Sequence, residues 1–179
     1  AKAVTVNLAA DANYTISKPI VATADVVING NGATIDASAL ASNMIQWTAK
    51  ASDDTEWTKA DITISGVTVK GLKKALFYSN GKYYYGDFSL DNSVIELAAD
   101  VTAFDYTKGS TAVNFTVTNS TIYASTATTK SLYSSQGGQK TTEWNAKAVQ
   151  TFKLTGNTMY NLAKAKNFFS HRQSNQKWN

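Results

Sequence analysis

The chain has 179 residues, of which 43% are hydrophobic and 17% charged, and its formal net charge is +4. This length suffices for one domain with a real core, so we treat residues 1–179 as a single domain. The chain has no cysteine, which excludes a disulfide framework, thiol catalysis and a thiolate metal site. No apolar run approaches the length of a membrane-spanning segment.

The domain begins with a segment that we expect to form an N-terminal cap or the first strands, residues 1–23. Its apolar stretches are Val4–Leu8 and Tyr14–Ile16, which are suited to covering the first coil of a solenoid. We expect residues 24–170 to form the coils and residues 171–179 to form a C-terminal tail.

Residues 24–170 contain five copies of one pattern: an apolar residue, any residue, Gly or Asn, two mostly small or polar residues, and an apolar residue. The first position recurs with spacings of 36, 26, 27 and 37 residues. Such spacings indicate a coil of about 26 residues that accepts loop insertions. The copies are Ile28–Ile35, with two extra residues at its corner, Ile64–Val69, Leu90–Ile95, Val117–Ile122 and Leu154–Met159.

A second apolar ladder lies two residues before the first, and mostly polar residues separate the two ladders. This alternation is typical of a strand with one buried face. One such strand in each coil, with no helical pattern between strands, predicts an all-β, right-handed parallel β-helix of about five coils with loop insertions. The second ladder consists of Val26, Ile62, Phe88, Phe115 and Phe152.

The corner position of the pattern holds only Gly or Asn. A chain that bends sharply between two strands uses a residue at positive φ, which Gly adopts freely and Asn more readily than other residues. We therefore predict left-handed corners at Gly66, Asn92, Asn119 and Gly156.

A third strand is expected 10 to 15 residues later in each coil. Aromatic residues at matching positions would lie about 4.8 Å apart along the axis and fill the interior. The expected strands are Met44–Gln46, Leu76–Tyr78, Ala103–Asp105, Leu132–Ser134 and Phe168–Ser170.

The pattern resembles the right-handed parallel β-helices of the pectate-lyase and chondroitinase-B type. More narrowly, Ala24–Gly30 and Ala60–Gly66 are similar to uncharacterised β-helix domains of secreted surface lipoproteins of gut bacteria, encoded near polysaccharide-utilisation genes. The resemblance implies a carbohydrate-related role and a secreted or cell-surface location. It transfers no catalytic residue, because the shared motifs are structural.

One outward row allows a catalytic interpretation. It places Lys70 between two carboxylates, Asp36 and Glu96, and beside Tyr123 and Tyr160. A polysaccharide lyase uses a basic group to abstract a proton, and tyrosines can stack on sugars. The structural interpretation is an alternating-charge ladder worth about 0.2–1 kcal/mol per pair. We favour the structural interpretation, since exposed cross-strand pairs need no function.

Three aspartates begin successive strands: Asp25, Asp61 and Asp87. Clustered aspartates serve hydrolases, and such a row can also hold Ca²⁺. Asp and Asn also favour strand starts because their side chains bind nearby backbone N–H groups. We favour this second role, because Asn114 and Thr151 take the same position in later coils. Ca²⁺ is the alternative, and we expect no other cofactor.

The loop aromatics are the expected ligand contacts. Trp57 and Trp144 recur in similar Thr-Glu-Trp insertions, and Tyr83, Tyr84 and Tyr85 follow a turn. Exposed aromatics in loops can stack on sugar rings, and they can equally fold back as packing lids. Both interpretations stay open.

The last part of the chain is basic, because no acidic residue follows Trp144. This charge could attract an acidic polysaccharide, although edge lysines that prevent strand pairing explain it better. We expect no nucleic-acid binding, since no recognised motif accompanies the charge, and His171 lacks partners for a triad or zinc site.

The expected function is that of a non-catalytic module that binds glycan or serves a structural role. A polysaccharide lyase or hydrolase acting on an acidic glycan is the alternative. An end coil without a cap would also allow contact with a neighbouring domain or self-association.

Overall fold

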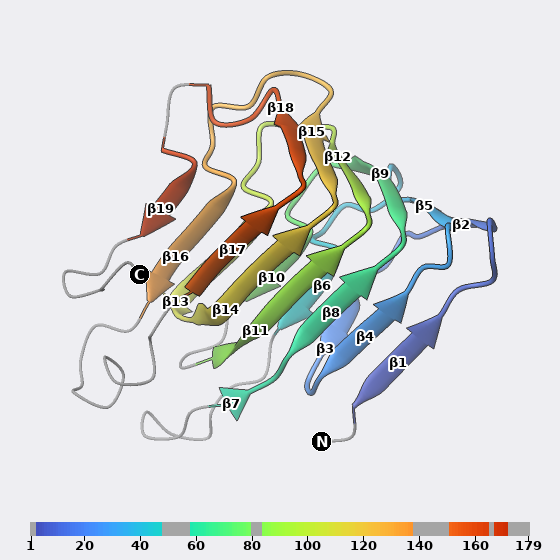
Figure 1. Ribbon diagram of the computed structural model, residues 1–179, viewed down its shortest axis with the longest axis horizontal. Coiled ribbons are helices and arrows are strands. Elements are labelled where there is room, and N and C mark those ends of the chain that lie inside the picture. Colours follow the sequence, from blue (N-terminus) through green and yellow to red (C-terminus); the bar gives the residue numbers. More distant parts are fainter. Residues whose placement is uncertain (1–2, 48–57, 80–83, 138–150, 165–166, 172–179) are drawn as a thin grey trace.

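The computed structural model describes residues 3–47, 58–79, 84–137, 151–164 and 167–171. These residues form a right-handed parallel β-helix whose three sheets each contribute one strand to each of six coils. The axis runs from the N-terminal coil at the lower right of Figure 1 to the C-terminal coil at the left. The described residues contain no helix, and therefore no helix that could cross a membrane.

The first sheet lies across the front of Figure 1, the second at its upper right and the third behind. The first sheet contains β1 (Val4–Asn7), β4 (Val26–Asn29), β8 (Ile62–Ser65), β11 (Tyr84–Asp91), β14 (Thr111–Thr118) and β17 (Thr151–Thr155), and β7 (Thr58–Lys59) pairs with β11. The second contains β2 (Asn13–Thr15), β5 (Thr34–Asp36), β9 (Thr68–Leu72), β12 (Val94–Leu97), β15 (Thr121–Ala124) and β18 (Thr158–Tyr160). The third contains β3 (Ile20–Ala22), β6 (Ile45–Trp47), β10 (Phe77–Ser79), β13 (Phe104–Gly109), β16 (Tyr133–Gly137) and β19 (Phe169–His171).

Residues 3–22 form a complete coil, which brings the total to six rather than about five. Their three strands pair in parallel with the strands of the second coil, and Val4 lies opposite Val26. This coil carries the same inward alternation as the others, with Val4 and Val6 aligned on Val26 and Ile28. The sequence pattern missed it because its corner residue is neither Gly nor Asn.

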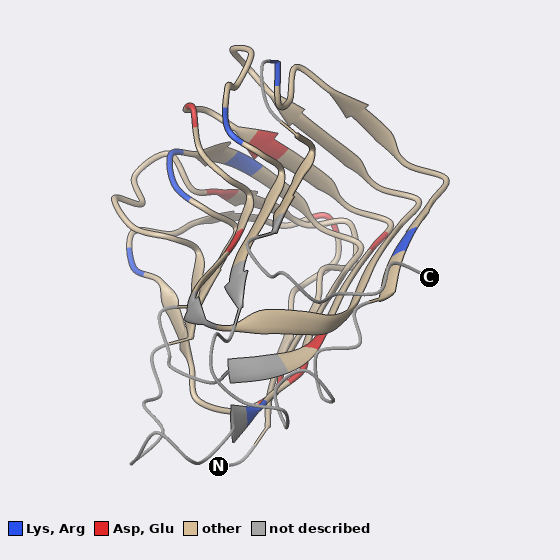
Figure 2. Ribbon diagram, turned by 90° about the vertical axis from the view of Figure 1, so that its left-hand side faces the viewer, with Lys and Arg blue, Asp and Glu red and all other residues tan. Residues whose placement is uncertain are grey.

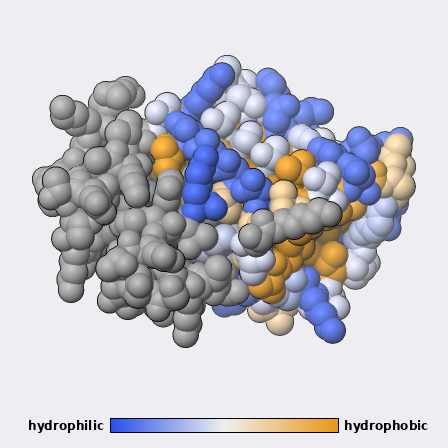
Figure 3. All heavy atoms as spheres, turned by 90° about the horizontal axis from the view of Figure 1, so that it is seen from below, coloured by the Kyte–Doolittle hydropathy of each residue, from blue (hydrophilic) through white to orange (hydrophobic). Residues whose placement is uncertain are grey.

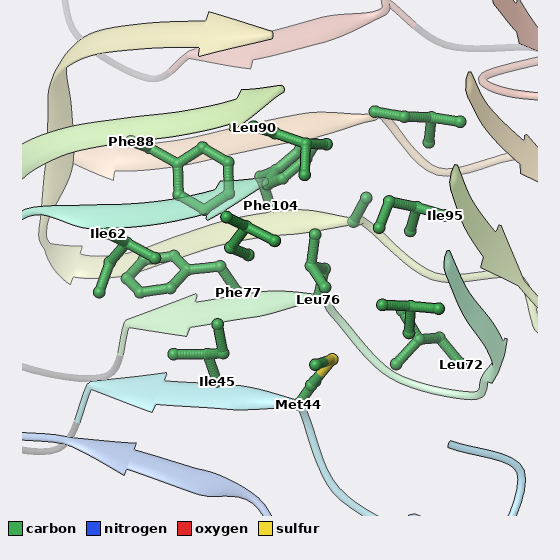
Figure 4. Close-up of a cluster of buried hydrophobic side chains, with 14 of the residues drawn as sticks. Met44, Ile45, Ile62, Leu72, Leu76, Phe77, Phe88, Leu90, Ile95 and Phe104 are labelled. Atoms are coloured by element: carbon green, nitrogen blue, oxygen red, sulfur yellow. The ribbon is translucent and has the colours of Figure 1, made fainter. Parts of the chain in front are cut away.

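The predicted apolar ladders are confirmed residue by residue. Ile62 lies opposite both Val26 and Phe88, and Phe115 lies opposite both Phe88 and Phe152. Side chains from the first and third sheets meet in the interior, as Ile62, Phe77, Phe88 and Phe104 do in Figure 4. The Phe115 ring lies 4.9 to 5.8 Å, between ring centroids, from four other aromatic rings. The aromatic residues of the third strands therefore form core, as predicted.

The predicted left-handed corners are also confirmed. A residue at positive φ occupies the corner between the first and second sheets in each coil. The residues are Asp11 (53°), Asn31 (51°) with Gly32 (81°), Gly66 (63°), Asn92 (46°), Asn119 (50°) and Gly156 (69°). Asp11 shows that a short polar side chain other than Asn can take this conformation.

The core ladders are open at both ends of the described solenoid. Among the residues that the structure describes, the exposed large hydrophobic ones all belong to the first or the last coil: Val4, Val21, Leu154 and Tyr160. Val4 and Leu154 occupy inward positions, and they are exposed because no described coil covers them. Seen from below, apolar surface is bordered by hydrophilic residues (Figure 3).

Candidate functional site

A groove of about 550 Å³ lies on the outer side of the third sheet. Its floor carries Tyr78, Asp105 and Ser134, which lie opposite one another on β10, β13 and β16. The turns that lead into these strands contribute its rim. The rim includes Lys74, Asp100 and Lys130. Because successive coils supply the groups, the groove runs along the solenoid axis.

The two carboxyl groups of this groove differ in what they bind. Asp100 Oδ1 accepts the backbone N–H groups of Thr129 (2.7 Å) and Lys130 (3.2 Å), and its Oδ2 accepts the Thr129 hydroxyl (2.7 Å). These bonds, led by those from Thr129, lower the pKa of Asp100. Asp100 therefore joins two coils and has little capacity left for a ligand.

Asp105 is the uncommitted group. Its half-buried side chain makes no hydrogen bond or ion pair to any residue in the described ranges. Burial raises the pKa of Asp105. A partly desolvated carboxyl without a partner is costly, and it gains most from a ligand that donates hydrogen bonds.

The sequence reasoning missed this groove. It considered the strands around Tyr78, Asp105 and Ser134 only for the aromatic residues that they direct inward. The signal was present, because the residue that follows each inward aromatic residue must face outward. What the sequence could not show is that the rim groups of Lys74 and Lys130 gather around the same row.

A second surface is the outer row of the second sheet, hereafter the second-sheet row. Its predicted members are confirmed as neighbours, since Asp36 lies opposite Lys70 and Tyr123 lies opposite both Glu96 and Tyr160. Figure 2 shows acidic and basic residues alternating on neighbouring strands. Thr15, opposite Asp36, extends the row into the first coil.

A bulge interrupts the row at its centre. Val69 and Leu72 lie opposite Ile95 and Leu97, so that Lys70 and Gly71 together oppose Glu96. Gly71 has a φ of 74°, and its N–H donates to Glu96 Oε2 at 3.2 Å. Bulges of this kind locally bend a strand and disturb its ladder.

The carboxylates of the row bind backbone rather than Lys70. Asp36 Oδ1 accepts the N–H of Ser38 at 2.8 Å. Hydrogen bonds from Ser38, aided by the charges of Lys70 and Lys73, lower the pKa of Asp36. Within the described ranges, the exposed Lys70 forms no ion pair with either neighbouring carboxylate.

The row also offers a groove and an aromatic pair. A groove of about 450 Å³ is lined by Tyr14, Thr15, Asp36, Ser38, Lys70 and Glu96, among others. Beyond Glu96, the rings of Tyr123 and Tyr160 stack, with 5.0 Å between the ring centroids and an angle of 13° between the ring planes. Burial, with the charge of Glu96 and the neighbouring Tyr160, raises the pKa of Tyr123. Tyr160 is 46% exposed.

The aspartates at the strand starts form hydrogen bonds between coils. Asp25 Oδ1 accepts the N–H of Asp61 at 2.8 Å, and Asp61 Oδ1 accepts the N–H of Asp87 at 2.9 Å. Asp87 Oδ1 in turn accepts both the backbone and the side-chain N–H of Asn114. These carboxylates thus bind backbone N–H groups, as we favoured, but the N–H groups belong to the next coil and not to the local turn that we expected. No three acidic or histidine side chains of the described residues gather as metal ligands.

Most of the expected ligand contacts cannot be placed. Trp57, Tyr83 and Trp144 lie outside the described residues. Tyr84 and Tyr85 belong to β11 and pair with β7, and the structure describes only their backbone, as it does for His171 in β19. The glycan-contact and packing-lid interpretations of these aromatics stay predictions.

Comparison with known proteins gives the family. No curated protein and no solved structure matches the chain. Residues 4–125, which run from β1 through β15, match the family described as "Domain of unknown function (DUF4957)". Because the match covers more than half of the 179 residues, the chain belongs to the DUF4957 family.

Proposed function

We propose that this chain is a non-catalytic β-helix module that binds glycan in the groove of the third sheet. The observation that carries the proposal is Asp105, a half-buried carboxyl group that has no partner in the described structure. Sugar hydroxyl groups are suitable donors for such a group, and hydrogen bonds to charged groups are the stronger ones.

The rest of the groove supports the same class of ligand. The side chain of Tyr78 lies beside Asp105 in register and offers an aromatic surface and a hydroxyl group. Lys74 and Lys130 are exposed at the rim, where their ammonium groups can bind ring oxygens or sugar carboxylates. The resemblance to pectate-lyase-type helices and to surface proteins of gut bacteria supports a polysaccharide ligand and a secreted or cell-surface location.

The hydrogen bonds that Asp100 already accepts favour glycan binding over glycan hydrolysis as the function of this groove. Glycoside hydrolases generally use two carboxyl groups, one as acid and one as base or nucleophile. Both oxygens of Asp100 already accept hydrogen bonds from Thr129 and Lys130, which leaves Asp105 alone in the groove. Binding to a polysaccharide requires no second carboxylate.

Affinity electrophoresis in gels that contain neutral or acidic polysaccharides tests the proposal. Asp105→Asn should weaken binding by about tenfold, because the charge and one of the two accepting oxygens are lost and the remaining hydrogen bond is to a neutral amide. Asp87→Asn is the matched control, since an Asn side-chain oxygen can still accept the N–H of Asn114. Unchanged binding by Asp105→Asn in a folded protein would refute the assignment of this groove.

The catalytic alternative has its own assay. Pectin, alginate and glycosaminoglycans are incubated with the protein, and the ultraviolet absorbance of unsaturated product is followed. We expect no product. If the wild type forms product and Lys70→Ala or Asp105→Asn does not, the protein is a lyase and the proposal of a non-catalytic module is wrong.

A further inference from the structure

The second-sheet row presents unused binding capacity on a face separate from the third-sheet groove. Thr15, Asp36, Lys70, Glu96, Tyr123 and Tyr160 follow one another along six coils, with a bulge at Gly71. At a spacing of about 4.8 Å, these six positions span about 24 Å. A surface of this length suits a linear chain laid along the solenoid axis.

The tyrosine pair gives one end of the row a platform for an apolar ring face. Tyr123 and Tyr160 are held parallel by their mutual stacking, and Tyr160 is 46% exposed. Large aromatic side chains in such positions lose little conformational entropy on binding, because the ring orientation is already fixed.

The groove at the other end supplies hydrogen-bonding groups. Asp36 accepts hydrogen bonds from Ser38, whereas Glu96 uses one oxygen for the N–H of Gly71 and its second oxygen has no partner in the described structure. The ammonium group of Lys70 also has none there. These groups can accept from and donate to the hydroxyl groups of a sugar chain.

The charge of the row selects among sugar polymers. Two carboxylates flank Lys70, and the ammonium group of Lys73 donates to the Ser38 carbonyl oxygen at the edge of the groove, so the row offers no net positive charge to a chain that carries a carboxylate on each sugar. The apolar face of Tyr160 and the free carboxylate oxygen of Glu96 instead match a chain of uncharged, hydroxylated rings.

We propose that the second-sheet row is a second ligand site, which binds a neutral linear polysaccharide and excludes acidic ones. This site is independent of the third-sheet groove, because none of the residues that line the two grooves is shared. If experiments disprove binding at one site, the proposal for the other site is unaffected, and variants on each face test the two proposals separately.

Titration calorimetry with the neutral glucan laminarin and with polygalacturonate tests the second site. Tyr160→Ala should weaken laminarin binding about twofold to tenfold, the effect of losing one aromatic stacking contact. Tyr160→Phe keeps the ring and should bind as the wild type does. Val21→Ala, an equally exposed position on the third sheet, is the control for loss of apolar surface.

The charge argument has a separate variant. Glu96→Gln keeps an oxygen for the N–H of Gly71 and removes the negative charge. It should weaken laminarin binding, because the free oxygen becomes an amide that cannot accept, and strengthen polygalacturonate binding in an Asp105→Asn background, where the other groove is disabled. Tyr160→Ala with wild-type laminarin affinity would overturn the site. Polygalacturonate that competes with laminarin on the wild-type row would overturn its selectivity.

Discussion

Replacing Gly30 with alanine tests how closely neighbouring coils approach at the corner of the solenoid. Gly30 has no positive φ, so its backbone conformation does not require glycine. A Cβ at this position would lie 2.4 Å from the carbonyl oxygen of Gly66 and 2.6 Å from Val67 Cβ. These atoms belong to the next coil, and the nearest of them is rigid backbone.

The cost follows from the separation that alanine demands. Ordinary contact begins near 3.4 Å, so the two coils must part locally by about 1.0 Å, the difference from 2.4 Å. The bonds from Gly30 N to Ser65 O and from Gly32 N to Gly66 O, both 2.7 Å, would then exceed hydrogen-bonding distance. Two lost bonds at about 0.5–1.5 kcal/mol each and overpacking of about 1–3 kcal/mol sum to about 2–6 kcal/mol.

Thermal and urea unfolding measure this loss. A destabilisation of that size lowers the Tm of a chain of this length by about 5–20 °C. Gly66→Ala is the control, because its Cβ would meet nothing closer than Asn31 N at 3.5 Å. Its cost should be only about 1–2 kcal/mol, for a side chain at positive φ. If Gly30→Ala is no less stable than Gly66→Ala, the close approach of the coils is refuted.

Three further outcomes are expected. Phe115→Ala should lower the free energy of unfolding, measured with urea, by about 3–5 kcal/mol, and Phe152→Ala should lower it less, since Phe152 is only partly buried in the last coil. Equal losses in the two variants would contradict the open C-terminal core. Burial raises the pKa of Asp105, so the folded state binds its proton more tightly than the unfolded chain, and ionisation costs stability as pH rises through the folded pKa. Asp105→Asn should therefore gain in Tm over the wild type at pH 7, with a gain that shrinks as pH falls towards about 4, whereas a pH-independent difference would exclude this linkage. Asp61→Ala should lower the free energy of unfolding by about 1 kcal/mol, and Asp61→Asn should lower it very little, because the amide oxygen can still accept the N–H of Asp87. If added Ca²⁺ raises the Tm of the wild type and either variant abolishes this increase, the result would instead support the metal alternative.

Much of the fold could be predicted because its determinants repeat along the chain. The inward ladders through Ile62 and Phe115 and the corners at Gly66 and Asn119 were readable as periodic patterns, and the structure confirms them. The first coil was predicted only as a cap or first strands and was not counted among the coils, because Asp11 stands at its corner. A pattern based on Gly and Asn does not include the less common residues that tolerate positive φ.

The candidate site was less predictable, because its chemistry depends on which hydrogen bonds are already made. Sequence alone presented Asp36 and Glu96 as equivalent acids on either side of Lys70, and it singled out neither Asp100 nor Asp105. In the structure Asp36, Glu96 and Asp100 accept backbone N–H groups, whereas Asp105 has no partner in the described ranges.

The coil, its inward residues and its corners could be predicted from the amino-acid pattern, since side-chain alternation and positive φ are local properties of the backbone. The number of coils, the bulge at Gly71 and the gathering of Lys74 and Lys130 around Asp105 became apparent only once the coils were stacked in three dimensions. These features depend on the register between strands whose paired residues lie 21 or more positions apart in the sequence, as Asn13 and Thr34 do. That register is set by stacking of the whole coil, including insertions of unequal length.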